Sequence, residues 1–294
     1  MNWMIYRKIY FLLSGVVIGI GLFSLVKWGL KFGIDFRGGT IAEYRFDKNI
    51  STNDLSKKIG EQNIEVISIQ PTGGNQYLFK LAPLNSDERE KLNQTIRDFI
   101  GSQKIDELRH ETVGPTIGPE LVKKTLFAIL IAAGSILLWV AYQFRSIKFG
   151  ASAILAMFHD SLVLIGLYSL LGQFFGAEVD FLFVTALLTT LSFSVHDTIV
   201  VYDRIRESQG KFGGTLSELA DKAVTETMVR SLNNSFTIIF MLVALAILGG
   251  ETVRWFAVAL LIGTISGTYS SPFVAVPLLV TWEDVVGKIR LKRR

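Results

Sequence analysis

The stretch LSFSVHDTIVVYDRIRE, residues 191–207, decides how this sequence is interpreted. It closes an apolar run long enough to cross a lipid bilayer, yet it places a histidine and an aspartate side by side, at His196 and Asp197. A charged side chain at the centre of a membrane-spanning helix costs at least about 2.5 to 3.5 kcal/mol. A carboxylate inside a span is therefore expected to have a role. Acids in membrane spans usually belong to ion pathways or form contacts between helices.

The composition of the whole chain also indicates a membrane protein. Of its 294 residues, 50% are hydrophobic and 19% are charged, against about 25% charged residues in soluble domains, and the mean hydropathy is +0.40. A helix that spans a bilayer needs about 20 mainly apolar residues. Such runs predict six spans, at approximately residues 10–30, 125–142, 149–171, 181–202, 233–249 and 255–280.

Two classes of site are not expected. The chain contains no cysteine, which excludes disulfides and cysteine-ligated zinc or iron–sulfur centres. Its three histidines are scattered and no H-E-x-x-H motif is present, so neither a metal site nor a cofactor is expected. The first apolar run follows Arg7 and Lys8 as a signal peptide would, but it is long and lacks an A-x-A-like cleavage site, so we expect an uncleaved first span.

The distribution of basic residues predicts the orientation, because short cytoplasmic loops are enriched in lysine and arginine. One side of the expected bundle carries most of them: Arg7, Lys8, Arg145, Lys148, Arg204, Arg206, Lys211, Lys222 and the tail KIRLKRR. The short loops of the other side, 172–180 and 249–254, contain only Arg254. Four further lysines fall on that side, beside a loop too long for the rule to apply: Lys27, Lys31, Lys123 and Lys124.

We therefore expect both termini in the cytoplasm and a multi-pass protein in the lipid of the cytoplasmic (inner) cell membrane. The net charge of +4 then reflects topology. No basic patch interleaved with aromatic residues is present, so nucleic acid is not an expected partner.

Residues 33–123 have soluble character. Strand and helix patterns follow one another there in the order βαββαβ, which is the ferredoxin-like α+β arrangement: strand 40–46, helix 51–63, a hairpin around Gly73 and Gly74, helix 85–102 and strand 104–113. Ser86 is the expected N-cap of the second helix.

Two glycine-rich linkers, GIDFRGGT (33–40) and VGPTIGPEL (113–121), flank this domain and supply tight turns that other residues resist. The residues assigned to these turns or hinges are Gly33, Asp35, Arg37, Gly38, Gly39, Gly114, Pro115 and Gly118. The expected division is residues 1–32 for a first span with a cytoplasmic N-terminus, 33–123 for an extracytoplasmic α+β domain, 124–282 for a five-helix bundle and 283–294 for a basic cytoplasmic tail.

The order of these motifs resembles the SecF branch of the SecD/SecF family of protein-export membrane proteins, within the resistance-nodulation-division superfamily. The two linkers, FHD at 158–160 and SVHDTIVVYDRIRE at 194–207 carry the resemblance, which covers nearly the whole chain. It implies a six-span half that pairs with SecD beside the SecYEG channel and uses a proton or sodium gradient to assist translocation of an unfolded polypeptide. The family pattern before DRIRE is closer to S-x-N-D, so His196 departs from it.

The resemblance also implies an ion pathway. Asp197 matches the family's acid in the fourth span and Arg230 its arginine at the start of the fifth, and an ion pair between them would hold the carboxylate ionised until a conformational change separates them. Asp160 near the middle of the third span, with His159 and His196, completes the candidate set, because buried carboxylates and histidines exchange protons when their surroundings change. His196 and Asp197 point about 100° apart on a helix, so each is expected to meet a different span.

Other residues have structural interpretations. Asp203, Arg204, Arg206 and Glu207 are predicted to cap the inner end of the fourth span. In the sixth span, close packing is expected at Gly263, Gly267, Ser270 and Ser271, and an interruption at Pro272 and Pro277.

Three functions stay open at this point. The chain is an ion-driven export subunit, a structural scaffold of the translocon whose charges only join helices, or a small-molecule exporter of the same superfamily, which would need a solute site and a larger outer domain. A hydrolase is not expected, because neither a nucleophile elbow nor a paired acid motif is present. The sequence leaves proton and sodium coupling undecided.

Overall fold

The computed structural model describes residues 2–101, 106–114, 117–144 and 146–292. The chain divides into two compact units. One is helical and comprises Met1–Lys31 and Phe127–Arg294, and the other is an α+β unit of Phe32–Leu126.

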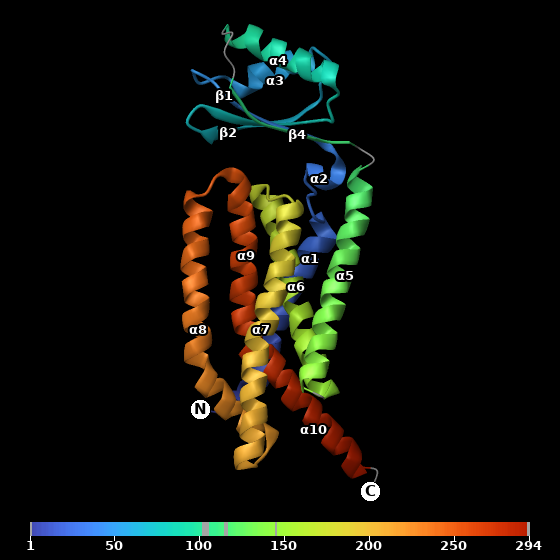
Figure 1. Ribbon diagram of the computed structural model, residues 1–294, viewed down its shortest axis with the longest axis vertical. Helices are drawn as coiled ribbons and strands as arrows, with labels where there is room; N and C mark the ends of the chain where they lie inside the picture. The colour runs from blue at the N-terminus through green and yellow to red at the C-terminus, as the bar shows by residue number, and fades with distance from the viewer. Residues whose placement is uncertain (1, 102–105, 115–116, 145, 293–294) are drawn as a thin grey trace. The chain divides into compact units, whose positions relative to one another are not determined.

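Within the described residues, six helical segments are long and apolar enough to cross a membrane, as predicted. They are Trp3–Trp28, Gly118–Phe144, Ile147–Phe175, Phe181–Lys211, Leu216–Leu248 and Val253–Val286. The elements that form them are the 3-10 turn η1 (Trp3–Tyr6), α1 (Arg7–Trp28), α5 (Ile117–Phe144), α6 (Ile147–Phe175), α7 (Phe181–Phe212), α8 (Leu216–Leu248), α9 (Glu251–Ser270), the π-helical segment η2 (Ser271–Ala275) and α10 (Val276–Lys292) (Figure 1).

Two helices extend well beyond their predicted apolar runs. The fourth span was expected to end at residue 202, but α7 continues to Phe212, and α8 begins at Leu216, long before the expected start at residue 233. Hydropathy marks the part of a helix that suits hydrocarbon, whereas the helix ends where its backbone is capped. For α8 that cap is a capping box, in which Thr215 accepts from the Glu218 N–H and Glu218 accepts from the Thr215 N–H.

The helices approach one another most closely at small residues. A Cβ on Gly21 of α1 would lie 2.9 Å from the Cα of Gly166 on α6. A Cβ on Gly263 of α9 would lie 2.0 Å from the Thr190 side chain of α7. Small residues bring helix backbones together in membranes, where apolar side chains gain little by leaving lipid.

The sixth span is interrupted at Pro272. Helix α9 ends at Ser270, one π-helical turn follows over Ser271–Ala275, and α10 continues from Val276. Proline lacks the N–H that a helix needs, and a π-turn accommodates that loss. The other predicted interruption, Pro277, lies inside α10.

The α+β unit contains one antiparallel sheet and two covering helices. The strands β1 (Gly39–Arg45), β2 (Val66–Gly73), β3 (Gln76–Leu81) and β4 (Asp106–Val113) lie in the order β2-β3-β1-β4. Helices α3 (Thr52–Gly60) and α4 (Ser86–Ile100) pack on one face of the sheet through a core that includes Leu55, Ile59, Leu92 and Ile96 (Figure 1). This arrangement confirms the expected α+β fold.

The predicted N-cap of α4 is wrong by one residue. Asn85 caps the helix, because its side chain accepts from the Glu88 N–H at 2.9 Å while Glu88 accepts from the Asn85 N–H at 2.9 Å. Ser86 is instead the first helical residue. Asn85 and Ser86 are both polar residues that can cap a helix. Only Asn85 is followed three residues later by a glutamate, Glu88, which completes a capping box.

The two linkers contact each other within the α+β unit. Gly33 precedes the short helix α2 (Ile34–Arg37), which contains Asp35, and Gly38 with a φ of 78° ends it. A Cβ on Gly39 would lie 2.8 Å from the Ile34 side chain, and one on Gly118 would lie 2.4 Å from the Phe36 carbonyl oxygen. Gly114 follows β4, and Pro115 lies outside the described residues.

The contact between Gly21 and Gly166 can be tested by adding one methyl group. Gly21→Ala should destabilise the protein by about 1 to 3 kcal/mol, because the new Cβ overlaps a neighbouring backbone. Gly19→Ala, two residues earlier in α1, is the matched control, since a Cβ there meets no atom within 4 Å. The measurement is thermal unfolding of the purified protein in detergent, and equal melting temperatures for the two variants would contradict this packing.

Candidate functional site

Asp197 is a buried carboxylate between two helices. It lies on α7, is 5% exposed and accepts a short hydrogen bond from the Ser231 hydroxyl of α8. No other hydrogen bond reaches it from the residues that the structure describes. An ionised carboxylate has room for about four donors, so Asp197 is sparsely satisfied for a buried charge.

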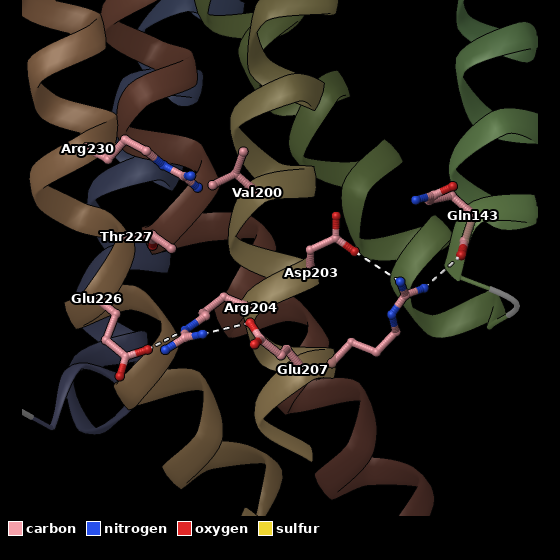
Figure 2. A pocket seen from close by; sticks show the side chains of 9 residues that line it. Gln143, Val200, Asp203, Arg204, Glu207, Glu226, Thr227 and Arg230 are labelled. Atoms are coloured by element: carbon pink, nitrogen blue, oxygen red, sulfur yellow. Dashed lines mark hydrogen bonds and ion pairs between the residues drawn. The ribbon is translucent and has the colours of Figure 1, made fainter. Parts of the chain in front are cut away.

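A polar cavity of about 860 Å³ is lined by residues of α5, α7 and α8 (Figure 2). Val200 lines it one turn after Asp197 on α7, and Thr227 lines it one turn before Ser231 on α8. The remaining walls are mostly charged: Gln143, Asp203, Arg204, Arg206, Glu207, Glu226 and Arg230. The cavity thus leads from charged ends of the helices toward the buried acid.

Most charges of this cavity form pairs. Arg204 bonds to Glu226 of α8 and to Glu207 at 2.6 Å, so it joins the two helices (Figure 2). Arg206 lies 3.3 Å from Asp203 and donates to the Gln143 carbonyl of α5 at 2.9 Å. These i, i+3 pairs agree with the structural cap expected for this end of α7.

The expected ion pair between Asp197 and Arg230 is not formed in this structure. Arg230 is exposed and lines the cavity, and it makes no ion pair with any described residue. It also lies about four turns into α8 rather than at its start. Adjacent helix residues point about 100° apart, so a helix that turns Ser231 toward Asp197 turns Arg230 toward the cavity.

His196 lies on the outer surface of the bundle, whereas Asp197, the next residue, is buried. His196 continues a row of exposed polar residues on α7, at Thr185, Thr189 and Ser192. These residues recur every three or four positions, which places them on one side of the helix. The neighbouring helix α8 also exposes polar side chains, at Asn233, Asn234 and Thr237. We call these seven residues the polar face.

Asp160 forms a second buried acidic centre, where α6, α7 and α9 meet. It is 3% exposed and accepts from Ser194 at 2.5 Å, from Ser266 at 2.6 Å and from Ser270 at 2.6 Å. His159 Nδ1 lies 3.0 Å from Asp160 Oδ1. Four partners saturate this carboxylate, in contrast to Asp197.

The serines that donate to the two acids are residues of the candidate site that the sequence interpretation missed. Ser270 and Ser271 were assigned to packing, but Ser270 bonds to Asp160 and Ser271 lies 3.0 Å from the Thr198 hydroxyl of α7. Ser266 and Ser270 are one turn apart, in line with Gly263 and Gly267. Serines at such spacing in an apolar span are the signal that could have identified the partner helix of Asp160.

Among the described residues, no three histidine, aspartate or glutamate side chains come close enough to hold a metal ion. The charged groups of the bundle instead form pairs and hydrogen bonds across neighbouring spans. Six helices long and apolar enough to cross a membrane, with an α+β unit after the first, define a polytopic membrane protein.

The chain belongs to the SecD/SecF family of protein export membrane proteins. The family's model for the SecD/SecF C-terminal region matches residues 93–285, and the SecD/SecF GG motif matches residues 23–50, which include Gly38 and Gly39. This confirms the resemblance that the order of motifs indicated.

Known relatives are translocase subunits. Protein translocase subunit SecF of Thermobaculum terrenum is 40% identical over 95% of this chain and 93% of its own length. Protein translocase subunit SecDF of Thermus thermophilus is 37% identical over 87% of this chain but 35% of its own length. The crystal structure of SecDF from Thermus thermophilus, described as a translocon-associated membrane protein, has a TM-score of 0.83 at 33% identity.

That alignment covers 97% of this chain and 39% of the SecDF chain, so this chain spans less than half of the fused protein. The relatives are named as components of transport and not as enzymes, which agrees with the expectation for this chain.

The contribution of the Asp160 hydrogen bonds to stability can be measured by removing one of the donors. Ser270→Ala should lower the free energy of unfolding by about 1.5 to 3 kcal/mol, because it removes a hydrogen bond to a buried charge. Ser161→Ala is the control, since the Ser161 hydroxyl only donates to the Met157 carbonyl of its own helix, at 2.9 Å. Thermal unfolding in detergent compares the two, and a Ser270→Ala protein as stable as the control would refute this assignment.

Proposed function

We propose that this chain is the SecF-type subunit of the protein-export machinery, and that with a SecD partner it uses an ion gradient to assist polypeptide translocation. Asp197 is the group that binds and releases the ion. The observation that carries this proposal is a buried carboxylate with a single hydroxyl partner, one helical turn from a polar cavity.

The arrangement around Asp197 suits reversible ion binding. A carboxylate with four donors is held in one state, whereas Asp197 has one, from Ser231, and keeps acceptor capacity for a proton or Na⁺. Arg230 lines the adjacent cavity without an ion-pair partner among the described residues. Arg230 reaching Asp197 in another state of the cycle would displace the ion, since an arginine favours the ionised carboxylate.

Pairing with SecD is supported by the relatives and by the surface of the bundle. In the Thermus thermophilus relative one chain carries the name SecDF, and this chain matches 35% of it. The polar face of α7 and α8 is exposed in the isolated chain. Polar side chains of membrane spans rarely face lipid, so a second set of spans covering this face explains its composition. His196, in place of the family's asparagine, then lies at that interface.

The orientation follows from the charges. Arg7 pairs with Asp284 at 2.7 Å and Lys148 pairs with Glu283 at 2.8 Å, so the two terminal segments lie at one end of the bundle, together with most of its basic residues. Placing that end in the cytoplasm agrees with the positive-inside rule. The cavity beside Asp197 then opens to the cytoplasm, and the α+β unit lies outside the inner membrane, where it meets the polypeptide that leaves the SecYEG channel.

The energy available is sufficient for a conformational cycle. One elementary charge that crosses 100 mV releases about 2.3 kcal/mol. A few kcal/mol are enough to change which of two states of a protein predominates. Translocation assisted in this way needs no covalent chemistry on the polypeptide.

The test is export of a secreted reporter into vesicles under an imposed proton or sodium gradient. Asp197→Asn keeps the size of the side chain but removes its charge, so we expect gradient-stimulated export to fall more than about tenfold, as expected when a driving force of about 2.3 kcal/mol per charge is lost. Asp284→Asn is the control, because this carboxylate is exposed and pairs with Arg7.

Recovery of the complex with SecD is measured in the same preparations. Intact complexes with lost stimulation support ion binding by Asp197. Normal export, or a loss that only follows dissociation of the complex, would favour the scaffold function instead. Comparing the two gradients separates proton from sodium coupling.

A further inference from the structure

A second cavity, of about 290 Å³, lies between α1, α6 and α9. Its walls are almost wholly apolar, with side chains such as Val17 of α1, Val163 and Leu167 of α6 and Ile262 of α9. It shares no lining residue with the cavity beside Asp197, and the function proposed above makes no use of it.

Packing contacts enclose this cavity at two points along α1. Before it, the ring centroids of Tyr10 and Phe273 of η2 are 4.8 Å apart, and those of Phe273 and Tyr269 are 5.6 Å apart. After it, α1 meets α6 at Gly21 and Gly166, where a Cβ added to Gly21 would lie 2.9 Å from the neighbouring Cα. The cavity therefore lies between two close contacts of the same helices.

The cavity opens sideways out of the bundle. Leu13 of α1 and Ile265 of α9 line it and are 52% and 51% exposed, so they form its rim. Leu13 and Val17 lie about 9 and 15 Å along α1 from its first residue, Arg7. In a hydrocarbon layer about 30 Å thick, this places the opening near the middle of the bilayer.

The surface around the opening suits lipid. From Ile9 to Val26, every exposed residue of α1 is apolar or glycine, and the two serines, Ser14 and Ser24, are buried. The polar face of α7 and α8 has the opposite composition. Apolar side chains gain little by leaving lipid for another apolar surface, so this side of the bundle does not favour a partner span over acyl chains.

The few polar side chains in the walls already have partners in the protein. Ser14 donates to the Tyr269 hydroxyl at 3.3 Å, and Tyr269 donates to a backbone carbonyl of α1 at 3.0 Å. Ser266 donates to Asp160 at 2.6 Å, and His159 Nδ1 lies 3.0 Å from the same carboxylate. A ligand of this cavity therefore needs no hydrogen-bonding group, and a hydrocarbon chain is complementary to the walls.

We propose that this cavity is a binding site for one acyl chain of a membrane phospholipid. Apolar cavities exclude water but take up apolar molecules, and acyl chains are the apolar molecules present at this depth of the bilayer. The chain supplies contacts that the wall side chains would otherwise lack. Because Ser266 and His159 line the cavity and also contact Asp160, the bound chain covers the lipid side of the Asp160 centre. The site does not depend on the function proposed above.

Photo-crosslinking of the full chain tests this site. The protein is reconstituted in liposomes of phosphatidylethanolamine and phosphatidylglycerol, with a phosphatidylethanolamine probe that carries a diazirine near the end of one acyl chain. Mass spectrometry should find crosslinks on wall residues of α9, such as Ser266 and Tyr269, and their yield should saturate as the probe fraction rises. Crosslinks on the exposed Leu12 of α1 should instead increase in proportion to the probe fraction.

Two variants of α1 distinguish the cavity from the surface beside it. Val17→Phe fills the cavity and should lower the crosslink yield on α9 by about tenfold, because a close-packed interior leaves no room for the chain. Val16→Phe is the matched control, since it adds the same ring at a side chain that is exposed and does not line the cavity. If Val17→Phe does not fold, Ile265→Phe, which narrows the opening, should also lower the yield.

The proposal is overturned by any of the following results. Crosslinks on the α9 wall that increase in proportion to the probe fraction would show ordinary lipid contact. An equal loss in Val17→Phe and Val16→Phe would show that the cavity is not the place of binding. Crosslinks that disappear when SecD is reconstituted with this chain would show that a segment of the partner fills the cavity.

Discussion

A buried carboxylate in a membrane bundle must obtain its hydrogen-bond donors from neighbouring helices, and much of this structure depends on that requirement. Asp160 on α6 obtains hydroxyls from α7 and α9, and Asp197 on α7 obtains one from α8. These contacts need close backbones, which small residues such as Gly263 and Gly267 allow. Burial of the acids and tight packing of the helices therefore depend on each other. Each acid needs donors from particular neighbouring helices, and those helices must pack closely to supply them.

The two buried acids differ in the number of donors that reach them. Asp160 accepts from three serines and lies against a histidine, so little of its acceptor capacity is left unused. Asp197 has one donor and lies a turn from a polar cavity, so most of its acceptor capacity is unused, and the proposed ion binding rests on this contrast. Both were candidates as aspartates in apolar runs, and Asp197 was also one through its match to the family's acid. Only the positions of serines on other helices distinguish them.

The fold was largely predictable and the site only in part. Six spans follow from runs of apolar residues, and the α+β unit follows from the alternation of strand and helix patterns. Helix ends were not predictable from hydropathy, because α7 and α8 continue through charged turns such as Arg204–Glu207 that pair across the helix surface. The acids themselves are visible in the sequence. The partners of these acids are not visible in the sequence. Ser231 contacts Asp197, whereas the expected partner was the preceding residue, Arg230. The two side chains point about 100° apart on α8, and only the structure shows which of them is directed to Asp197.

The polar face of α7 and α8 has a consequence for how the protein is made. Imidazole and amide groups that point out of a six-span bundle lose water on insertion and find no replacement in acyl chains, whereas the hydroxyls of Thr185, Thr189 and Thr237 donate to carbonyls of their own helices. Under the proposed pairing with SecD, a copy inserted in excess of its partner would expose these groups within the bilayer. Such a surface would distinguish unassembled copies from assembled ones, because the spans of the partner would cover it only in the complex.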